Sequence, residues 1–389
     1  MTIKKYIKVG IDAANLRGGG GVTHLVELLR ATEPEEMGIE GIVVWGGTST
    51  LNLIDDRPWI KKCYVPELDR GLLQRTIWQR FSLSKVVRNE GCDILFVPGG
   101  SYAGSFSPIV TMSRNLLPFD TSELKRYGLT FIAIKLLILR FTQSYSYKHA
   151  QGVIFLTNYA FQVVTDWTGR IGALTRVIPH GLNTRFCNPP KLQRPITDYD
   201  FKNPYRIIYV STIDQYKHQW HVVEAVESLR KFGMPIALDL IGSSYPPALN
   251  RLKASIAHYD PRGAWINYLG PVPFNDLHQY YLRADLGLFA SSCENMPNIL
   301  LETMASGLPI ASSNRGPMPE ILGATGIYFD PEQPVDIANA LIELINSPNL
   351  RSDLSKASYD CAIQYSWHLC ARKTYQFIVD VTQRYKGAT

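Results

Sequence analysis

Short apolar runs alternate with longer helical patterns along nearly the whole chain, and this alternation predicts an α/β protein with parallel sheets. The runs form two series on either side of residues 188–204, a stretch rich in proline, lysine and asparagine. We therefore expect two doubly wound domains joined by a linker. The first series of candidate strands is 6–11, 41–45, 94–97, 109–112, 153–156 and 175–178. The second series is 206–211, 237–241, 265–269, 286–290, 309–312 and 327–329.

Two glutamates stand eight positions apart in the segment SSCENMPNILLETMASGLPI, residues 291–310. The pattern predicts a loop that carries Glu294 and a helix over 297–306 that carries Glu302, with Pro297 in its first turn. The free N–H groups at a helix start attract phosphate, and a carboxylate accepts hydrogen bonds from paired sugar hydroxyls. This arrangement predicts a sugar-nucleotide site.

Four glycines, Gly18–Gly21, lie between the first candidate strand and a predicted helix. Glycine lets the backbone approach a phosphate closely. A dinucleotide-binding dehydrogenase is disfavoured, because Thr23 stands where GxGxxG needs its last glycine and the second strand ends in Trp45–Thr48 without an acidic residue. A surface loop without a ligand remains the alternative for these glycines.

The residues around the two glutamates resemble a known signature. Met296-Pro297-Asn298 follows Glu294, and ASGLP at 305–309 follows Glu302, as in the retaining glycosyltransferases of family 4, which have the GT-B fold. Further landmarks occur in the family's order: VGIDAANLRGGGGVTHLVELL at 9–29, IPHGLN at 178–183, the strand and loop at 209–217, and PEI at 319–321.

The resemblance implies two Rossmann-like, doubly wound parallel-sheet domains that face each other across a cleft. Residues 1–190 would form the N-terminal acceptor-binding domain, and residues 200–365 the C-terminal nucleotide-sugar domain. Residues 366–389 would form a C-terminal helix that crosses back to the N-terminal domain. A 389-residue chain with 46% apolar residues is long enough for two such cores.

The implied reaction is transfer of a sugar from a nucleotide diphosphate sugar to an acceptor hydroxyl with anomeric retention. Glu302 would bind the ribose, Glu294 the donor sugar, and Lys217 the diphosphate. Asn298 and Ile299 would offer helix-start N–H groups to the diphosphate, and Gly20 and Gly21 would close over the donor. The sugar nucleotide is a substrate, and we expect neither a cofactor nor a metal.

The chain departs from the family's pattern at one cationic position. If Lys217 is the family's lysine, Thr212 stands where an arginine is common, in the diphosphate loop. Arg114, in SRNLLP, is a candidate substitute because the matching family segment often carries a histidine in the active cleft. We expect His24 and His180 to be structural.

The net excess of positive charge lies in the first half of the chain. Residues 1–180 contain 21 Lys+Arg against 15 Asp+Glu, a net of +6, which equals the net charge of the whole chain. Within 57–148 the count is 14 basic against 6 acidic residues. This excess fits contact with an anionic membrane or an ordinary solvated basic face equally well, and no nucleic-acid motif accompanies it.

A cytoplasmic protein is expected. The basic excess in the first half of the chain extends this expectation to association with the inner face of the membrane. The six cysteines include no CxxC pair, and the stretch before Asp12 lacks the long apolar core of a secretory signal. Bacterial surface polysaccharide or lipopolysaccharide assembly, on a glycan or lipid-linked acceptor, is the expected setting. A non-catalytic nucleotide-binding subunit and a GT-B phosphorylase or epimerase remain alternatives.

Overall fold

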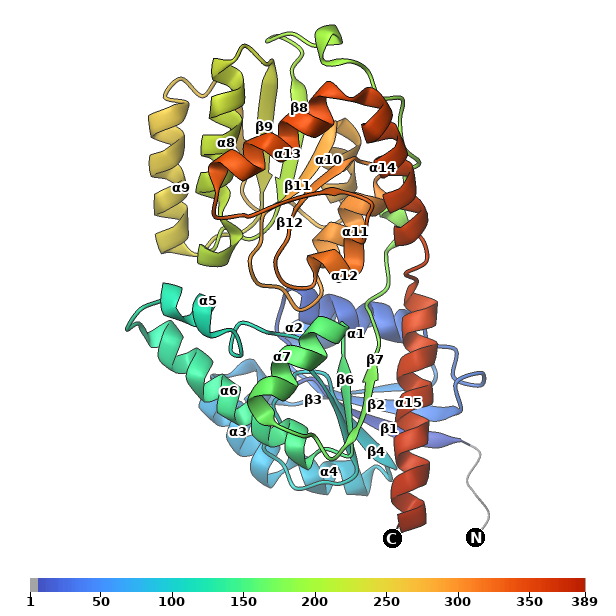
Figure 1. Ribbon diagram of the computed structural model, residues 1–389. Coiled ribbons are helices and arrows are strands. Elements are labelled where there is room, and N and C mark those ends of the chain that lie inside the picture. The colour runs from blue at the N-terminus through green and yellow to red at the C-terminus, as the bar shows by residue number, and fades with distance from the viewer. Residues whose placement is uncertain (1–5, 389) are drawn as a thin grey trace. The chain divides into compact units, whose positions relative to one another are not determined.

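The computed structural model describes residues 6–388, and these fall into two compact units (Figure 1). The first unit comprises the described residues up to Leu124, then Gly128–Gly181 and the segment from Ser366 onward. The second unit comprises Leu182–Tyr365 together with Lys125–Tyr127. Residues 1–5, part of the stretch in which no secretory signal was expected, lie outside the described residues.

The first unit is built on a parallel sheet of seven strands in the order β3-β2-β1-β4-β5-β6-β7. The central strands are almost completely buried, as expected where helices cover both faces of a parallel sheet. The strands are β1 Ile7–Asp12, β2 Ile39–Gly46, β3 Ile60–Tyr64, β4 Ile94–Val97, β5 Ile109–Met112, β6 Gly152–Phe155 and β7 Leu174–Val177.

Strand β3 is absent from the sequence prediction, and its position explains why. It is an edge strand that pairs only with β2, and none of its five residues is fully buried. Lys61 and Lys62 interrupt its apolar pattern, and charged residues of this kind protect a sheet edge from unwanted pairing. The rule that identifies buried strands therefore does not identify β3.

Helices surround the first sheet. They are α1 Gly20–Arg30, α2 Thr48–Leu51, α3 Leu72–Phe81, α4 Leu83–Asn89, α5 Thr121–Arg126, α6 Phe131–His149, α7 Asn158–Thr168 and α15 Trp367–Ala388, with the 3-10 turn Pro66–Asp69. The last of these helices packs on α1, β4 and β6 of the first unit. At Gly152 of β6 an added Cβ would lie 2.8 Å from Val381, so a side chain here would push α15 away.

The second unit has a six-stranded parallel sheet in the order β10-β9-β8-β11-β12-β13. In chain order within the unit this is 3-2-1-4-5-6, the arrangement of the dinucleotide-binding folds. The order reverses between β8 and β11, so the loops after these two strands flank the switch point where such sheets bind ligands. The strands are β8 Tyr205–Val210, β9 Ile236–Ile241, β10 Ile266–Tyr268, β11 Leu286–Phe289, β12 Ile310–Ser313 and β13 Ile327–Phe329.

The helices of the second unit cover this sheet (Figure 1). They are α8 Gln219–Lys231, α9 Pro246–Tyr259, α10 Leu277–Arg283, α11 Asn298–Ala305, α12 Met318–Leu322, α13 Pro334–Asn346 and α14 Pro348–Ala362, with 3-10 turns at Thr184–Phe186, Ile196–Asp198 and Gln215–Lys217. Among residues 6–388 of both units, no helix combines the length and apolar character that crossing a membrane requires.

Candidate functional site

The switch point of the second sheet brings Lys217 and Glu294 together. Lys217 ends the loop after β8, and Glu294 lies in the loop after β11. Their side chains form an ion pair and are 7% and 16% exposed. Because the pair is largely withdrawn from water, its charges interact more strongly than those of a surface pair. Two of the predicted site residues, 77 positions apart, are thus direct neighbours.

Aromatic rings line the environment of the Lys217 ammonium group. The Nζ atom lies 4.9 Å from the centre of the Tyr216 ring and 5.6 Å from that of Phe289. The hydroxyl of buried Tyr209 donates to the Lys217 carbonyl over 2.8 Å, which fixes the backbone. An ammonium group has three donor hydrogens, so Lys217 can bind Glu294 and still offer donors to a phosphate.

His218 ties the two switch-point loops to each other. It adopts a left-handed backbone conformation, with φ 53°, at the N-cap of α8. Its Nε2 atom lies 2.9 Å from the Ser292 hydroxyl, and the Ser292 N–H donates to the Tyr216 carbonyl over 2.9 Å. Burial lowers the pKa of His218 to about 3, so the neutral imidazole is the form that packs here. The sequence offered only the HxxH spacing, which does not indicate this role.

Thr212 supplies no charge to the site. Its hydroxyl lies 3.3 Å from that of Ser243, and its carbonyl accepts from Gln219 over 3.0 Å. The backbone is close-packed at this point, since a Cβ on Gly242 would lie 2.0 Å from the Ser211 carbonyl oxygen. The position that commonly carries a family arginine is therefore a polar turn.

Helix α11 begins one residue later than the sequence predicted. Pro297 is the N-cap, with extended backbone angles, and not a residue of the first turn. The physical reason is that the N–H groups of Leu300 and Leu301 bond to the Pro297 carbonyl, which makes this residue the cap. Asn298 and Ile299 then hold the first two helical positions, whose N–H groups have no acceptor within the helix. Asn298 Oδ1 is buried without a hydrogen-bond partner among the described residues.

Glu302 is a buried acid on α11. It is 8% exposed, and its carboxyl group makes no hydrogen bond to another described side chain or backbone group. Burial raises its pKa to about 8, against a smaller opposing effect of the nearby Arg185 guanidinium. A buried carboxyl without a partner is costly for the fold, which is typical of a binding site.

Arg185 is a residue of this site that the sequence reasoning missed. Its guanidinium lies 4.9 Å from the centre of the Phe274 ring, and its Nε atom donates to Asn183 over 3.0 Å. It is the cation that acts on the Glu302 carboxyl. The sequence feature that could have indicated it is its position two residues after Asn183, the last residue of the IPHGLN landmark.

In the first unit, the structure brings Arg114 next to the glycine segment. A Cβ on Gly21 would lie 2.7 Å from Arg114 Nη1, so only glycine leaves room for the guanidinium there. Gly20 and Gly21 form the first turn of α1, and the left-handed Gly19 is the N-cap. Burial lowers the pKa of Arg114 to about 10, and its Nε atom is buried without a hydrogen-bond partner among the described residues. A helix start and an unpaired cation together favour an anion.

His24 and His180, both in the first unit, form a buried pair. Their Nδ1 atoms lie 2.8 Å apart, and Trp367 packs against both rings. Burial lowers the pKa of His180 to about 3, with Arg114 adding a smaller effect. For His24, burial, then His180, then Arg114 hold the pKa well below its usual value. One neutral ring donates to the other, which is a packing role.

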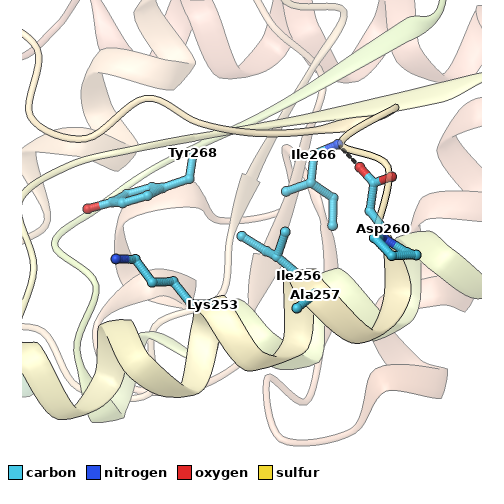
Figure 2. Close-up of a pocket in the computed structure, with 7 residues that line it drawn as sticks. Lys253, Ile256, Ala257, Asp260, Ile266 and Tyr268 are labelled. Atoms are coloured by element: carbon cyan, nitrogen blue, oxygen red, sulfur yellow. Dashed lines mark hydrogen bonds between the residues drawn. The ribbon is translucent and has the colours of Figure 1, made fainter.

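A hollow of about 450 Å³ elsewhere in the second unit is lined by Lys253, Asp260, Tyr268 and apolar side chains. Figure 2 shows Asp260 between α9 and β10 with its carboxylate turned to the Ile266 N–H. The same carboxylate also accepts from the N–H groups of Ala264 and Trp265, so it closes the turn after α9. We interpret it as a structural anchor.

Within residues 6–388, one group of side chains has metal-ligand spacing. The ligand atoms of Glu33, Glu36 and His368 lie within 4.8 Å of one another, and all three residues are exposed. Exposed acidic groups often cluster without an ion, and the site residues described above are not among them.

Part of the chain matches known glycosyltransferases. Residues 198–360 match the family model of the glycosyl transferases group 1, which confirms the resemblance over the second unit. O-antigen chain mannosyltransferase B of Escherichia coli is 26% identical over 167 residues, which are 43% of this chain and 44% of that protein. The chain spans less than half the length of the first curated relatives that it matches.

The solved structures extend the likeness over the whole chain. Sucrose-phosphate synthase from Thermosynechococcus elongatus has a TM-score of 0.77 at 16% identity, covering 98% of this chain and 100% of that one. The Anabaena protein HepE, solved in complex with UDP and glucose, has a TM-score of 0.67 at 16% identity, covering 98% and 99%. These likenesses show the GT-B fold, and the fold class predicted from the sequence is confirmed.

Proposed function

We propose that this chain, whose residues 198–360 match the glycosyl transferases group 1, transfers a sugar from a nucleotide diphosphate sugar to an acceptor hydroxyl with retention of the anomeric configuration. The observation that carries the proposal is the buried Glu302 carboxyl, which accepts no hydrogen bond from residues 6–388, on the helix that follows the Lys217–Glu294 pair. The paired hydroxyls of a ribose could donate hydrogen bonds to this carboxyl group.

In this proposal the second unit holds the donor. Lys217 and the N–H groups of Asn298 and Ile299 stabilise the diphosphate as charge develops on the leaving group. Glu294 binds hydroxyls of the donor sugar while it keeps Lys217 oriented. The departing phosphate oxygen takes the acceptor's proton, so the reaction needs neither a metal nor a cofactor.

The first unit would hold the acceptor and supply a second cation. Arg114 and the start of α1 at Gly20 and Gly21 offer a buried cation and helix-start N–H groups to the donor phosphates. The relative named as an O-antigen mannosyltransferase supports a role in bacterial surface polysaccharide or lipopolysaccharide assembly, with a glycan or lipid-linked acceptor.

A non-catalytic nucleotide-binding subunit is the second candidate. It is favoured by Thr212, which replaces a cation, and by Lys217, whose charge is already neutralised by Glu294. Such a subunit would bind a nucleoside diphosphate and catalyse neither transfer to an acceptor nor donor hydrolysis.

The test is a calorimetric titration with UDP, GDP and dTDP, followed by turnover of the matching sugar nucleotide. We expect Glu302→Ala to lose donor affinity mainly and Glu294→Ala to lose turnover mainly. Glu343→Ala removes an exposed glutamate of the same unit and should behave as the wild type. Wild-type kinetics in both site variants would refute the assignment, and nucleotide binding without turnover would favour the second candidate.

A further inference from the structure

Helix α6 differs from an ordinary surface helix, because it buries polar residues and exposes several large apolar ones. Its buried residues include Arg140, Gln143 and Ser146. The Arg140 guanidinium donates to the Pro118 carbonyl, and the Ser146 hydroxyl accepts from the Tyr102 N–H over 2.8 Å. These internal bonds, with the buried apolar residues Ala133, Leu136 and Tyr147, fix which side of the helix faces the core.

The outward side of α6 carries an apolar stripe. Five large side chains follow one stripe at spacings of three and four residues, as the faces of a helix require. Their exposed fractions are 81% for Phe131, 56% for Ile134, 58% for Ile138, 72% for Phe141 and 60% for Tyr145.

Helix α3 repeats the same feature. Leu73, Ile77 and Phe81, four residues apart, are 69%, 49% and 76% exposed, whereas Gln79 is buried and accepts from the Ala103 N–H. The loop that contains Ala103 also bonds to α6 through Tyr102, so the two helices border one loop. Figure 1 shows both helices on the first unit.

We define the α3–α6 face by its exposed residues Leu72, Leu73, Ile77, Arg80, Phe81, Phe131, Ile134, Lys135, Ile138, Phe141, Tyr145 and Lys148. Together with Leu129 and Leu137, the large apolar residues of this face make up 11 of the 22 exposed large apolar residues in the described chain. Neither α3 nor α6 contains an acidic residue. The face therefore combines exposed apolar side chains with positively charged ones and has no negatively charged ones.

We propose that the α3–α6 face docks on an anionic lipid bilayer. Its aromatic and aliphatic side chains enter the boundary between headgroups and acyl chains, and Arg80, Lys135 and Lys148 bind the anionic headgroups. A second copy of the chain fits less well, because a twofold contact would bring this basic face against itself. The docking does not depend on the proposed sugar transfer, although it would place the enzyme where a lipid-linked acceptor lies.

The experiment is cosedimentation of the full chain with phosphatidylcholine vesicles, with and without phosphatidylglycerol, in the absence of sugar nucleotide. The wild type should bind the anionic vesicles at low salt and dissociate as salt rises. An Ile77→Ser/Phe81→Ser/Phe141→Ser variant and an Arg80→Glu/Lys135→Glu/Lys148→Glu variant should each bind at least about tenfold less.

Matched controls use exposed residues outside the face. A Leu192→Ser/Phe232→Ser variant, at side chains 88% and 83% exposed, and Lys202→Glu should bind as the wild type does. Absence of wild-type binding to anionic vesicles at low salt would overturn the proposal, as would equal losses in the face and control variants. A wild-type dimer in light scattering that the face variants dissociate, without vesicle binding, would assign the face to a second copy instead.

Discussion

At the scale of single residues, we expect Glu302 to couple proton release to nucleotide binding. Burial disfavours the charged form and raises its pKa from an ordinary value of 4.5 to about 8 in the fold. The folded chain therefore holds a proton that the unfolded chain releases between about pH 4.5 and 8. The contribution of this group to stability is complete below about pH 4.5 and is lost as the pH rises through about 8.

We expect donor nucleotide binding near pH 7 to release a proton from Glu302, because ribose hydroxyls bind the carboxylate form best. Calorimetric titrations in two buffers of different ionisation enthalpy would measure this release. In Glu302→Gln the release should disappear, and the free energy of unfolding above pH 8 should exceed that of the wild type by a few kcal/mol, on the order set by the pKa difference. A Glu302→Gln variant that still releases the proton would assign the linkage to another group.

At the scale of elements, the close approach of α11 to β11 positions Glu302. A Cβ on Gly287 of β11 would lie 2.1 Å from Thr303 Cγ2 on the neighbouring turn of α11. The next contacts, at 3.6 and 3.8 Å, are ordinary. One methyl group is therefore all that an alanine at this strand position would displace.

Gly287→Ala should lower the free energy of unfolding by about 1–3 kcal/mol through overpacking, and it should weaken nucleotide binding because α11 carries Glu302. Combining it with Thr303→Ser removes the opposing methyl group and keeps the hydroxyl that donates to the Ile299 carbonyl. Denaturant unfolding of the single and double variants gives the coupling energy. Additive losses in the double variant would contradict this account of the packing.

The elements also show what the sequence determines. Buried strands such as β4 and β5 are predicted from continuous apolar runs, and all of the predicted strands are present in the structure. The edge strand β3 is not predicted, because Lys61 and Lys62 interrupt its apolar pattern. The ion pair between Lys217 and Glu294 could not be predicted either. Both residues were predicted to lie in the site, but their contact depends on how β8 and β11 pair. The exposure of the α6 aromatics was not predictable either, because an apolar run does not show which side of its helix packs inward.

At the scale of the whole molecule, each unit has its own core, and α15 belongs to the first. Its residues Tyr375, Phe377, Ile378 and Val381 are buried, and a Cβ on Gly181 would lie 2.3 Å from the Trp367 backbone nitrogen. The helix thus replaces solvent over α1, β4 and β6.

A chain shortened to residues 1–365 should lose stability in the first unit alone. In differential scanning calorimetry we expect the transition of the first unit to fall in temperature or vanish, because apolar surface of its sheet becomes exposed. The transition of the second unit should persist and should still rise with the donor nucleotide. Loss of nucleotide binding in the shortened chain would show that the second unit depends on α15.

The chain also leaves the first unit at Gly181 and returns to it at Ser366, after the whole of the second unit. On the ribosome, residues are added in order, and domains fold as their residues emerge. The second unit is then complete while β4 and β6 of the first still lack the helix that covers them. Translation therefore imposes an order in which the second unit matures first, and the unit that carries the α3–α6 face is finished only when α15 has been made.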